Sequence, residues 1–282
     1  MTDRTPPFDP QEQPMPGHTG AMSPQPDHGE ESYRGSGRLE GMAALITGGD
    51  SGIGRAVALA YAREGADVMI SYLDETEDAQ ATLSLVEGAG RRGYVVPGDI
   101  QDPAHCRSLV RDAHEAFGRL DILVNNAAHQ AHFDAFEDIS NEEWDATFRT
   151  NIHAMFYLCK AAAPLMSDGG SIINTASINS DSPNPGLLAY ATTKGAIQNF
   201  TAGLAQMLAP RGIRVNCVAP GPVWTPLIPS TLPDVENFGK SKPMGRPAQP
   251  AELASAYVML ADPASSYTAG ATVAVTGGEP MI

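Results

Sequence analysis

Tyr190 and Lys194 are the residues whose types and spacing most directly suggest chemistry. They lie four residues apart, so a helix would place both side chains on one face. A phenol beside an ammonium group can act as a general acid or base, because the positive charge favours the phenolate. Lys194 is one of only four lysines among 282 residues, but the chain has eight tyrosines. Such a pair can therefore arise by chance, and it needs support from other residues.

Two polar residues upstream give that support. Ser177 follows a short apolar run that predicts a strand, and Asn151 lies within a long predicted helix. Ligands of open parallel sheets bind at the carboxyl ends of the strands, so we expect these side chains to converge on one cleft with Tyr190. Each residue taken alone also has a structural interpretation, as a buried aromatic, a turn residue or a polar residue inside a helix. The combination favours catalysis.

The elements that must position these residues alternate between strand and helix. The expected strands are apolar throughout rather than on one face, which indicates a parallel sheet covered on both sides. The predicted strands span 42–47, 66–72, 93–97, 121–125, 171–175, 213–218 and 272–275. The predicted helices span 52–64, 75–87, 141–166, 189–208 and 251–260, and a further helix opens at Asp102 and Pro103. This pattern predicts an α/β fold with a doubly wound, seven-stranded parallel sheet (a Rossmann fold), in a single domain over residues 42–282.

A glycine-rich turn follows the first predicted strand. Its glycines are Gly48, Gly52 and Gly54, one residue wider than the common dinucleotide fingerprint. Glycine allows a tight turn and a close backbone approach, and the following helix offers free N–H groups to a pyrophosphate. Because the turn lies between a strand and an amphipathic helix, it predicts a nucleotide site.

The end of the second predicted strand indicates which dinucleotide binds. Asp74 and Glu75 follow this strand, Asp50 lies in the first turn, and no basic residue is near in sequence. An acid there bonds a ribose 2′-hydroxyl and repels a 2′-phosphate, so NAD is expected, with NADP as the alternative. Asp74 and Glu75 could also simply suit the first turn of a helix. Asp99, after the third strand, is placed to bond the adenine amino group.

These features together resemble the short-chain dehydrogenase/reductase family. The matching pieces keep the order and approximate spacing of that family over residues 42–282. They are Thr47-Gly48-x-x-x-Gly52-x-Gly54, Asp99, Asn125-Asn126-Ala127-Ala128, Asn151, Ser177, Tyr190-x-x-x-Lys194 and Pro220-Gly221. The stretches 35–39 and 48–55 and the proline-rich start resemble the branch named for glucose/ribitol dehydrogenase. Ala128 departs from the commoner final glycine.

The resemblance implies a role for each catalytic candidate. Tyr190 would be the general acid/base, and Lys194 would lower the pKa of its phenol and bind the nicotinamide ribose. Ser177 would hold the substrate oxygen, and Asn151 would link Lys194 through a water to a proton relay. The implied reaction is hydride transfer between NAD(P) and the CH–OH or carbonyl group of a small alcohol, sugar, polyol or aldehyde. A sensor or scaffold without turnover, and an epimerase or lyase, are the alternatives.

The cofactor is expected to touch residues from several loops at the carboxyl edge of the sheet. The candidates are Gly48, Asp50, Ser51, Gly52, Ile53, Gly54, Tyr72, Asp99, Ile100, Asn126, Ala127, Ala128, Tyr190, Lys194, Pro220, Gly221, Val223 and Thr225. By resemblance, the backbone of 125–128 would pass the adenine ribose, and Val223 and Thr225 would contact the nicotinamide carboxamide. The family's usual assembly implies a homotetramer.

Composition bounds the possible partners. There are 33 acidic and 18 basic residues, a formal net charge of −15, which disfavours nucleic acid and anionic membranes. The three cysteines, Cys106, Cys159 and Cys217, form no metal or disulfide pattern and are expected to be buried and reduced. Without a signal peptide or an apolar stretch long enough to span a bilayer, a cytoplasmic protein is expected.

Three segments have more than one interpretation. Residues 1–41 carry seven of the 23 prolines, and they predict either a disordered tail or an extended arm docked on another surface, such as a neighbouring subunit. The proline-rich stretch 226–250 predicts a substrate lid or a surface loop. His129 and His132 could line the substrate site or lie in a plain loop, and a metal site is disfavoured because no third ligand is near.

Overall fold

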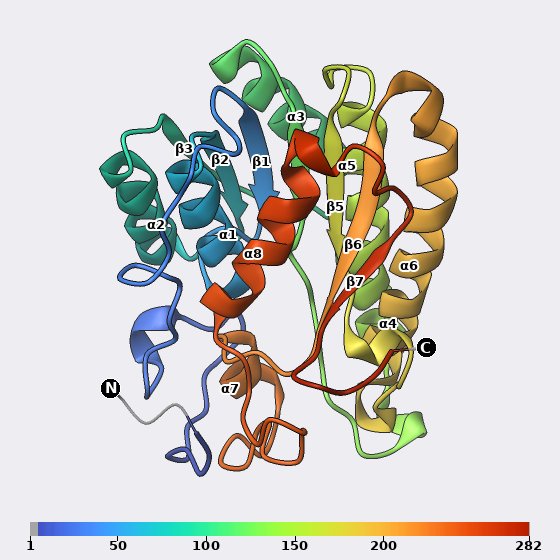
Figure 1. Ribbon diagram of the computed structural model, residues 1–282. Helices are drawn as coiled ribbons and strands as arrows, with labels where there is room; N and C mark the ends of the chain where they lie inside the picture. The colour runs from blue at the N-terminus through green and yellow to red at the C-terminus, as the bar shows by residue number, and fades with distance from the viewer. Residues whose placement is uncertain (1–4, 282) are drawn as a thin grey trace.

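Seven parallel strands form one sheet at the centre of the molecule (Figure 1). The computed structural model describes residues 5–281. The strand order is β3-β2-β1-β4-β5-β6-β7. The strands are β1 (Ala43–Thr47), β2 (Asp67–Tyr72), β3 (Gly93–Pro97), β4 (Ile122–Asn125), β5 (Ser171–Thr175), β6 (Arg214–Pro220) and β7 (Thr272–Val275). Because the order reverses between β1 and β4, a crevice opens there at the carboxyl ends of the strands. The predicted fold is confirmed.

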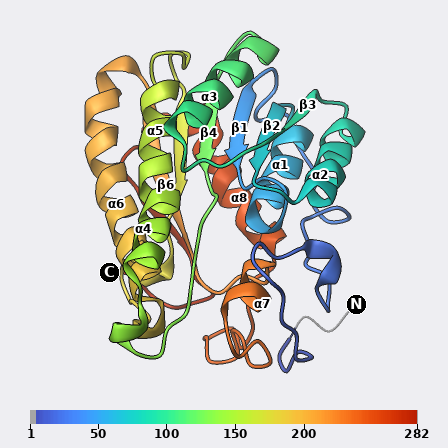
Figure 2. The same ribbon diagram turned by 180° about the vertical axis from the view of Figure 1, so that it is seen from behind.

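Helices cover both faces of this sheet, as Figures 1 and 2 show from opposite sides. One layer contains α1 (Gly52–Arg63), α2 (Thr76–Gly88) and α8 (Pro250–Ala261). The other contains α3 (Pro103–Phe117), α4 (Asn141–Phe148), α5 (Ala154–Ala162) and α6 (Leu188–Leu208). Successive residues of β1 point into different cores: Ala44 and Ile46 pack with α1 and α8, and Leu45 packs with α3 and α5. This period of two explains why the strand is apolar at every position.

The long helix predicted over 141–166 is interrupted. A π-helical turn, Arg149–His153, separates α4 from α5, and α5 ends at Ala162, two residues before Pro164. The π-helical turn contains Asn151, whose side chain hydrogen-bonds outside its own helix. A widened turn of this kind often marks a functional position in a helix.

The proline-rich arm docks on its own chain. Of its apolar residues, Phe8, Met22 and Leu39 are buried, and the segment from Thr5 to Gly41 runs beside the glycine-rich end of the sheet and the short helix α7 (Leu227–Thr231) (Figures 1 and 2). Between the two expectations for the arm, the structure therefore favours docking over a disordered tail. The surface that receives the arm belongs to the same chain.

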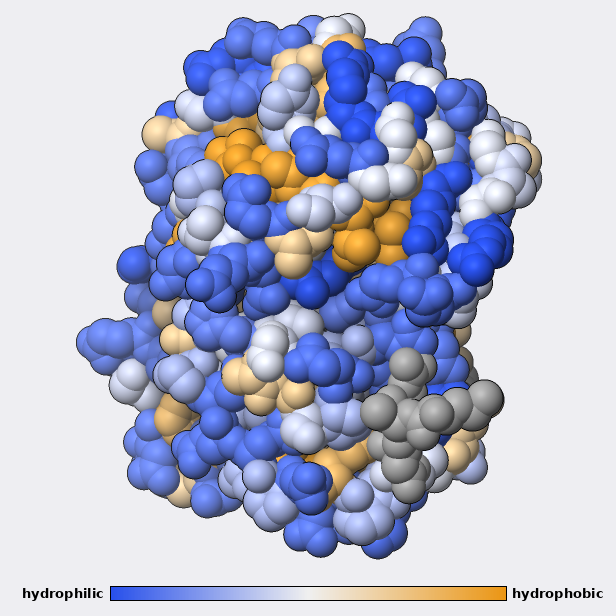
Figure 3. All heavy atoms as spheres, turned by 90° about the vertical axis from the view of Figure 1, so that its left-hand side faces the viewer, coloured by the Kyte–Doolittle hydropathy of each residue, from blue (hydrophilic) through white to orange (hydrophobic). Residues whose placement is uncertain are grey.

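One side of the surface is largely polar and the three cysteines are buried, as the composition of the chain led us to expect. The side carrying α2 and β3 is largely hydrophilic, with apolar side chains gathered mainly in its upper half (Figure 3). Cys106, Cys159 and Cys217 are free and buried. Burial raises the thiol pKa of Cys106 and of Cys159 to about 12, and also raises that of Cys217. Within residues 5–281, no helix is long and apolar enough to cross a membrane.

Candidate active site

A cleft of about 470 Å³ lies at the carboxyl ends of the central strands. It is lined by most of the cofactor residues expected from the sequence, together with Ser177, Tyr190 and Lys194. The expected cofactor residues on its wall are Gly48, Asp50, Ser51, Gly52, Ile53, Tyr72, Asp99, Ile100, Asn126, Ala127, Ala128, Tyr190, Lys194, Pro220, Gly221, Val223 and Thr225. Gly54 and Asn151 are not on this wall. Segments separated by over a hundred residues thus meet at one site.

The glycine-rich turn packs closely against the start of α1 and the loop after β4. Gly48 has a φ of +59°, and a Cβ there would lie 2.9 Å from the Cα of Ala127. At Gly54, a Cβ would overlap the carbonyl oxygen of Gly48, so this glycine lets α1 begin directly against the turn. Ser51 makes no side-chain cap, which leaves the first N–H groups of α1 free for an anion. The turn therefore fits a dinucleotide.

Asn126 connects this turn to β4. Its side-chain amide donates to the carbonyl oxygens of Thr47 (3.2 Å) and Gly48 (3.0 Å). In return, the Thr47 hydroxyl accepts from the backbone N–H groups of Asn126 and Ala127. These bonds hold the ends of β1 and β4 in register, which fixes the floor of the cleft.

Ser177, Tyr190 and Lys194 lie together on the opposite wall. Ser177 follows β5, and Tyr190 and Lys194 come from the first two turns of α6. Ser177 hydrogen-bonds the Tyr190 phenol. The Lys194 Nζ lies 5.1 Å from the centre of the Tyr190 ring and donates to the carbonyl oxygen of Thr175 at 2.7 Å. The i, i+4 spacing thus places both side chains on one face of α6.

Burial governs the titration of this pair. It raises the pKa of Tyr190 to about 12, although the Ser177 hydrogen bond opposes the shift. It also lowers the pKa of Lys194 to about 7. The lowering of the phenol pKa by Lys194 together with a positively charged nicotinamide stays a prediction.

The Asn151 side chain links two of the segments that form the site. Its Oδ1 accepts from the backbone N–H of His129 (2.7 Å), and its Nδ2 donates to the His129 carbonyl oxygen (2.9 Å) and to the Thr193 hydroxyl (3.0 Å). These bonds tie the loop after β4 to α6 immediately before Lys194. The water-mediated link from Asn151 to Lys194 stays a prediction.

His129 is one member of a polar pair at the mouth of the cleft. Its Nε2 lies 2.8 Å from Oε1 of Glu143, and the same oxygen accepts from the Thr147 hydroxyl. No local pattern in the sequence points to Glu143, which follows His129 by fourteen residues. His132 instead packs against Gly186, and residues 5–281 contain no cluster of three or more side chains able to hold a metal ion.

Two carboxylates mark the end of the cleft near β2. Glu75 lines the cleft and accepts from the backbone N–H groups of Leu73 (3.2 Å) and Asp74 (3.0 Å), whereas Asp74 is exposed and off the wall. Burial, and then the charge of Glu75, raise the pKa of Asp50 to about 7. Of the acids expected beside the ribose, Glu75 and Asp50 therefore lie at the cleft.

The cleft wall also contains residues that no sequence motif predicted. Met15, Pro16 and Gly17 of the arm line it, and so do Leu227, Ile228 and Ser230 of α7. The apolar residues scattered among the prolines of the arm, Met15 among them, were the signal available in the sequence.

Comparison with known proteins identifies the family. A family model described as enoyl-(acyl carrier protein) reductase matches residues 48–279. A short-chain dehydrogenase from Burkholderia cenocepacia, solved in complex with NADP, superposes with a TM-score of 0.81 at 36% identity, over 86% of this chain and 98% of that one. The chain belongs to the short-chain dehydrogenase/reductase family of oxidoreductases.

Two relatives within this family match over nearly the whole chain. An uncharacterised oxidoreductase of Bacillus subtilis, YhdF, is 52% identical over 94% of this chain and 92% of its own length. A glucose and ribitol dehydrogenase of Daucus carota is 45% identical over 96% of each chain. The arm lies partly within the matched region, so it is shared with these relatives to that extent.

Proposed function

We propose that the protein is an NAD(P)-dependent oxidoreductase that interconverts the CH–OH and carbonyl forms of a small alcohol, sugar, polyol or aldehyde. The observation that carries this proposal is the placement of Ser177, Tyr190 and Lys194 in one cleft with the glycine-rich turn. The name of the carrot relative supports a polyol or sugar as substrate.

The proposed mechanism assigns one task to each residue. A nicotinamide cofactor, when bound, supplies or accepts the hydride. The Tyr190 phenol donates a proton to the substrate oxygen during reduction and takes it back during oxidation. Ser177 hydrogen-bonds the same oxygen, and protonated Lys194 stabilises the phenolate that remains on Tyr190. Asn151 keeps α6 in place through Thr193 and His129.

Two observations bear on the form of the cofactor. NADP is favoured by the Burkholderia structure, which was solved with it, and the NAD preference expected from the sequence has no such support. The carboxylate of Glu75 stands against a 2′-phosphate, because it already accepts the amides of Leu73 and Asp74. If NADPH binds more tightly than NADH, the phosphate must compete with Glu75 for these amides.

The proposal is tested with a panel of alcohols, polyols and aldehydes, read at the nicotinamide absorbance with both cofactor forms. Turnover is expected for at least one class, and Tyr190→Phe is expected to lower kcat by about 10²–10⁴-fold, the usual contribution of a general acid. Binding of the reduced cofactor should survive this change. Activity undiminished in Tyr190→Phe would contradict the assignment, and conversion of a substrate without any nicotinamide absorbance change would favour an epimerase or lyase.

We also propose that the protein works as a cytoplasmic homotetramer. Large apolar side chains on the outer faces of α5 and α6, among them Phe156 and Met207, are exposed in the single chain, so they suit burial between subunits.

A further inference from the structure

The N-terminal arm is fixed to the loop that closes one side of the cleft. The Phe8 ring stacks on the Trp224 ring at 4.2 Å, and the Trp224 Nε1 donates to the carbonyl oxygen of Pro24 at 2.8 Å. A small apolar cluster joins Phe8 and Met22 of the arm to Trp224, Ile228 and Val235. The arm thus supplies part of the core on which this loop rests.

Backbone hydrogen bonds continue this attachment within α7 and just after it. The N–H of Phe8 donates to the carbonyl oxygen of Glu236 at 2.9 Å, and that of Gln13 donates to Pro229 at 3.0 Å. At Gly17 the arm passes so close to Pro226 that an added Cβ would clash with its carbonyl oxygen.

The same arm is also fixed to the other wall of the cleft. The N–H of Thr19 donates to Oδ2 of Asp78 at 2.9 Å, and Oδ1 of Asp78 pairs with Arg55 at 2.7 Å. Arg55 in turn donates to the carbonyl oxygen of Asp50, within the glycine-rich turn. The arm is thereby coupled through two side chains to the cradle for the pyrophosphate.

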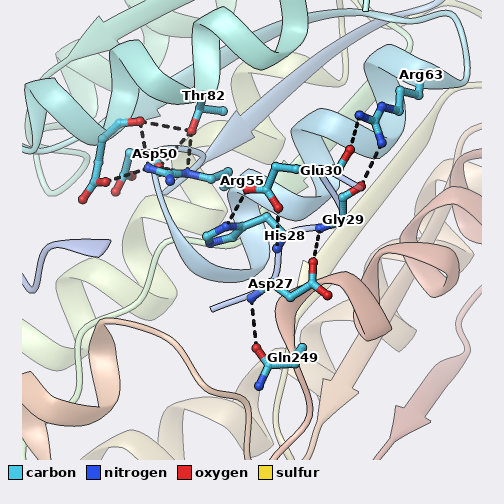
Figure 4. A network of polar contacts seen from close by, with 10 residues as sticks. Asp27, His28, Gly29, Glu30, Asp50, Arg55, Arg63, Thr82 and Gln249 are labelled. Carbon is cyan, nitrogen blue, oxygen red and sulfur yellow. Dashed lines mark hydrogen bonds and ion pairs between the residues drawn. The ribbon is translucent and has the colours of Figure 1, made fainter. Parts of the chain in front are cut away.

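Figure 4 shows the next part of the arm in its seat between α1 and the start of α8. The N–H of Asp27 donates to the side chain of Gln249 at 2.9 Å, and Arg63 donates to the carbonyl oxygens of Gly29 and Glu30. These bonds anchor residues 27–30 to α1 and α8, so the arm segment that precedes them is held at its C-terminal end.

Between these two sets of attachments, Met15, Pro16 and Gly17 form part of the cleft wall. Gly17 lies against Pro226, which with Thr225 approaches Gly52 at the N-terminus of α1. A ligand held at that helix terminus would be bounded by the sheet, the loop and the arm.

We infer that residues 15–17 are part of the cofactor site, and that the arm holds the 226–239 loop over the bound dinucleotide. The arm must then detach from this loop before the cofactor leaves. This inference rests on the proposed function. It assigns the arm a role in cofactor retention, separate from the proton chemistry of Tyr190.

The test uses the full chain and the fluorescence of bound NADH and NADPH. Excess oxidised cofactor is mixed in, and the release rate of the reduced form is measured. Phe8→Ala removes the stacked ring and should raise the release rate about tenfold or more, with a smaller change in the association rate. Met15→Ala should raise it less, because that side chain is 43% exposed.

Tyr33→Phe is the matched control on the same arm. It loses the hydrogen bond from the Tyr33 hydroxyl to Glu64, which is away from the cleft, and its release rate should equal that of the unchanged protein. Hydrogen exchange of residues 8–24 reports whether Phe8→Ala has freed the arm. A freed arm with an unchanged release rate would overturn the inference and leave the proposed function intact. Failure of the unchanged protein to bind either reduced cofactor would overturn both.

Discussion

At the scale of single residues, the site combines one buried amine, one buried phenol and a group of buried or half-buried carboxylates. Desolvation favours the uncharged forms of both groups, because it raises the pKa of Tyr190 and lowers the pKa of Lys194. A cationic cofactor ring entering the cleft would favour the phenolate. Cofactor binding is therefore expected to be coupled to the protonation of this pair.

Glu75 is expected to control the choice between the two cofactor forms. In Glu75→Ala the backbone N–H groups of Leu73 and Asp74 lose their acceptor, and a negative charge disappears. A 2′-phosphate could then accept from these N–H groups without repulsion from the carboxylate. The ratio of NADPH to NADH affinity, measured by fluorescence titration, should rise about tenfold or more. Asp74→Ala is the control, since its carboxylate is exposed; a similar shift in both variants would show that only net charge matters.

Asp50 is expected to cost stability at neutral pH. Its pKa is raised from 3.8 to about 7 on folding, so the folded state binds the proton more tightly and stability from this group falls as the pH rises between those values. Asp50→Asn should therefore have a higher free energy of unfolding than the unchanged protein at pH 8, by an amount on the order of a few kcal/mol at most, as measured by urea unfolding. The difference should shrink towards pH 4. A difference that stays constant across this range would mean that Asp50 is ionised without penalty.

At the scale of elements, the sequence predicted those features that depend on residues close together in the chain. The alternation of strands and helices is written in short-range periodicity, and the spacing of Tyr190 and Lys194 is fixed by one helix. The π-helical turn at Asn151 could not be predicted, and the hydrogen bonds of the Asn151 side chain go to the backbone of His129, 22 residues away in the sequence. The pairing of His129 with Glu143 depends on the path of the loop between β4 and α4, so local sequence periodicity could not predict it either.

The start of α1 offers a direct test of the pyrophosphate cradle. Gly54→Ala would drive a methyl group into the Gly48 carbonyl oxygen, so we expect a loss of about 1–3 kcal/mol in stability together with weakened cofactor binding. Gly88→Ala, at the end of α2 with no atom within 4 Å of the added Cβ, is the matched control. Its unfolding free energy should stay within about 1 kcal/mol of the unchanged protein. Both are measured by urea unfolding and by cofactor titration.

At the scale of the whole molecule, the arm joins parts of the chain that are far apart in sequence. Its bonds to Trp224 and Gln249 span 200 and 222 residues. Local patterns carry no information on such contacts, so composition alone left the arm open between disorder and docking. Docking of the arm on its own chain also explains Phe8 and Met22, which anchor the arm in an apolar cluster.

Removal of residues 1–24 should lower the melting temperature without changing the assembly. The deletion exposes Trp224 and its apolar neighbours, but the arm makes these contacts within its own chain. Light scattering should give the same number of chains per particle before and after the deletion; for the full chain the mass is about four times 29.7 kDa if the proposed tetramer forms. A fall in the number of chains on deletion would show that the arm also holds subunits together.

The buried thiols have a practical consequence for labelling. Thiol reagents attack the thiolate, and Cys106, Cys159 and Cys217 are all enclosed, with pKa values raised by burial. The native cysteines therefore need no removal before a dye is attached elsewhere. A cysteine at Gly20, an exposed arm position with open space around its Cβ, would be the first thiol to react. A fluorophore there would report arm opening in single molecules of an otherwise unaltered protein.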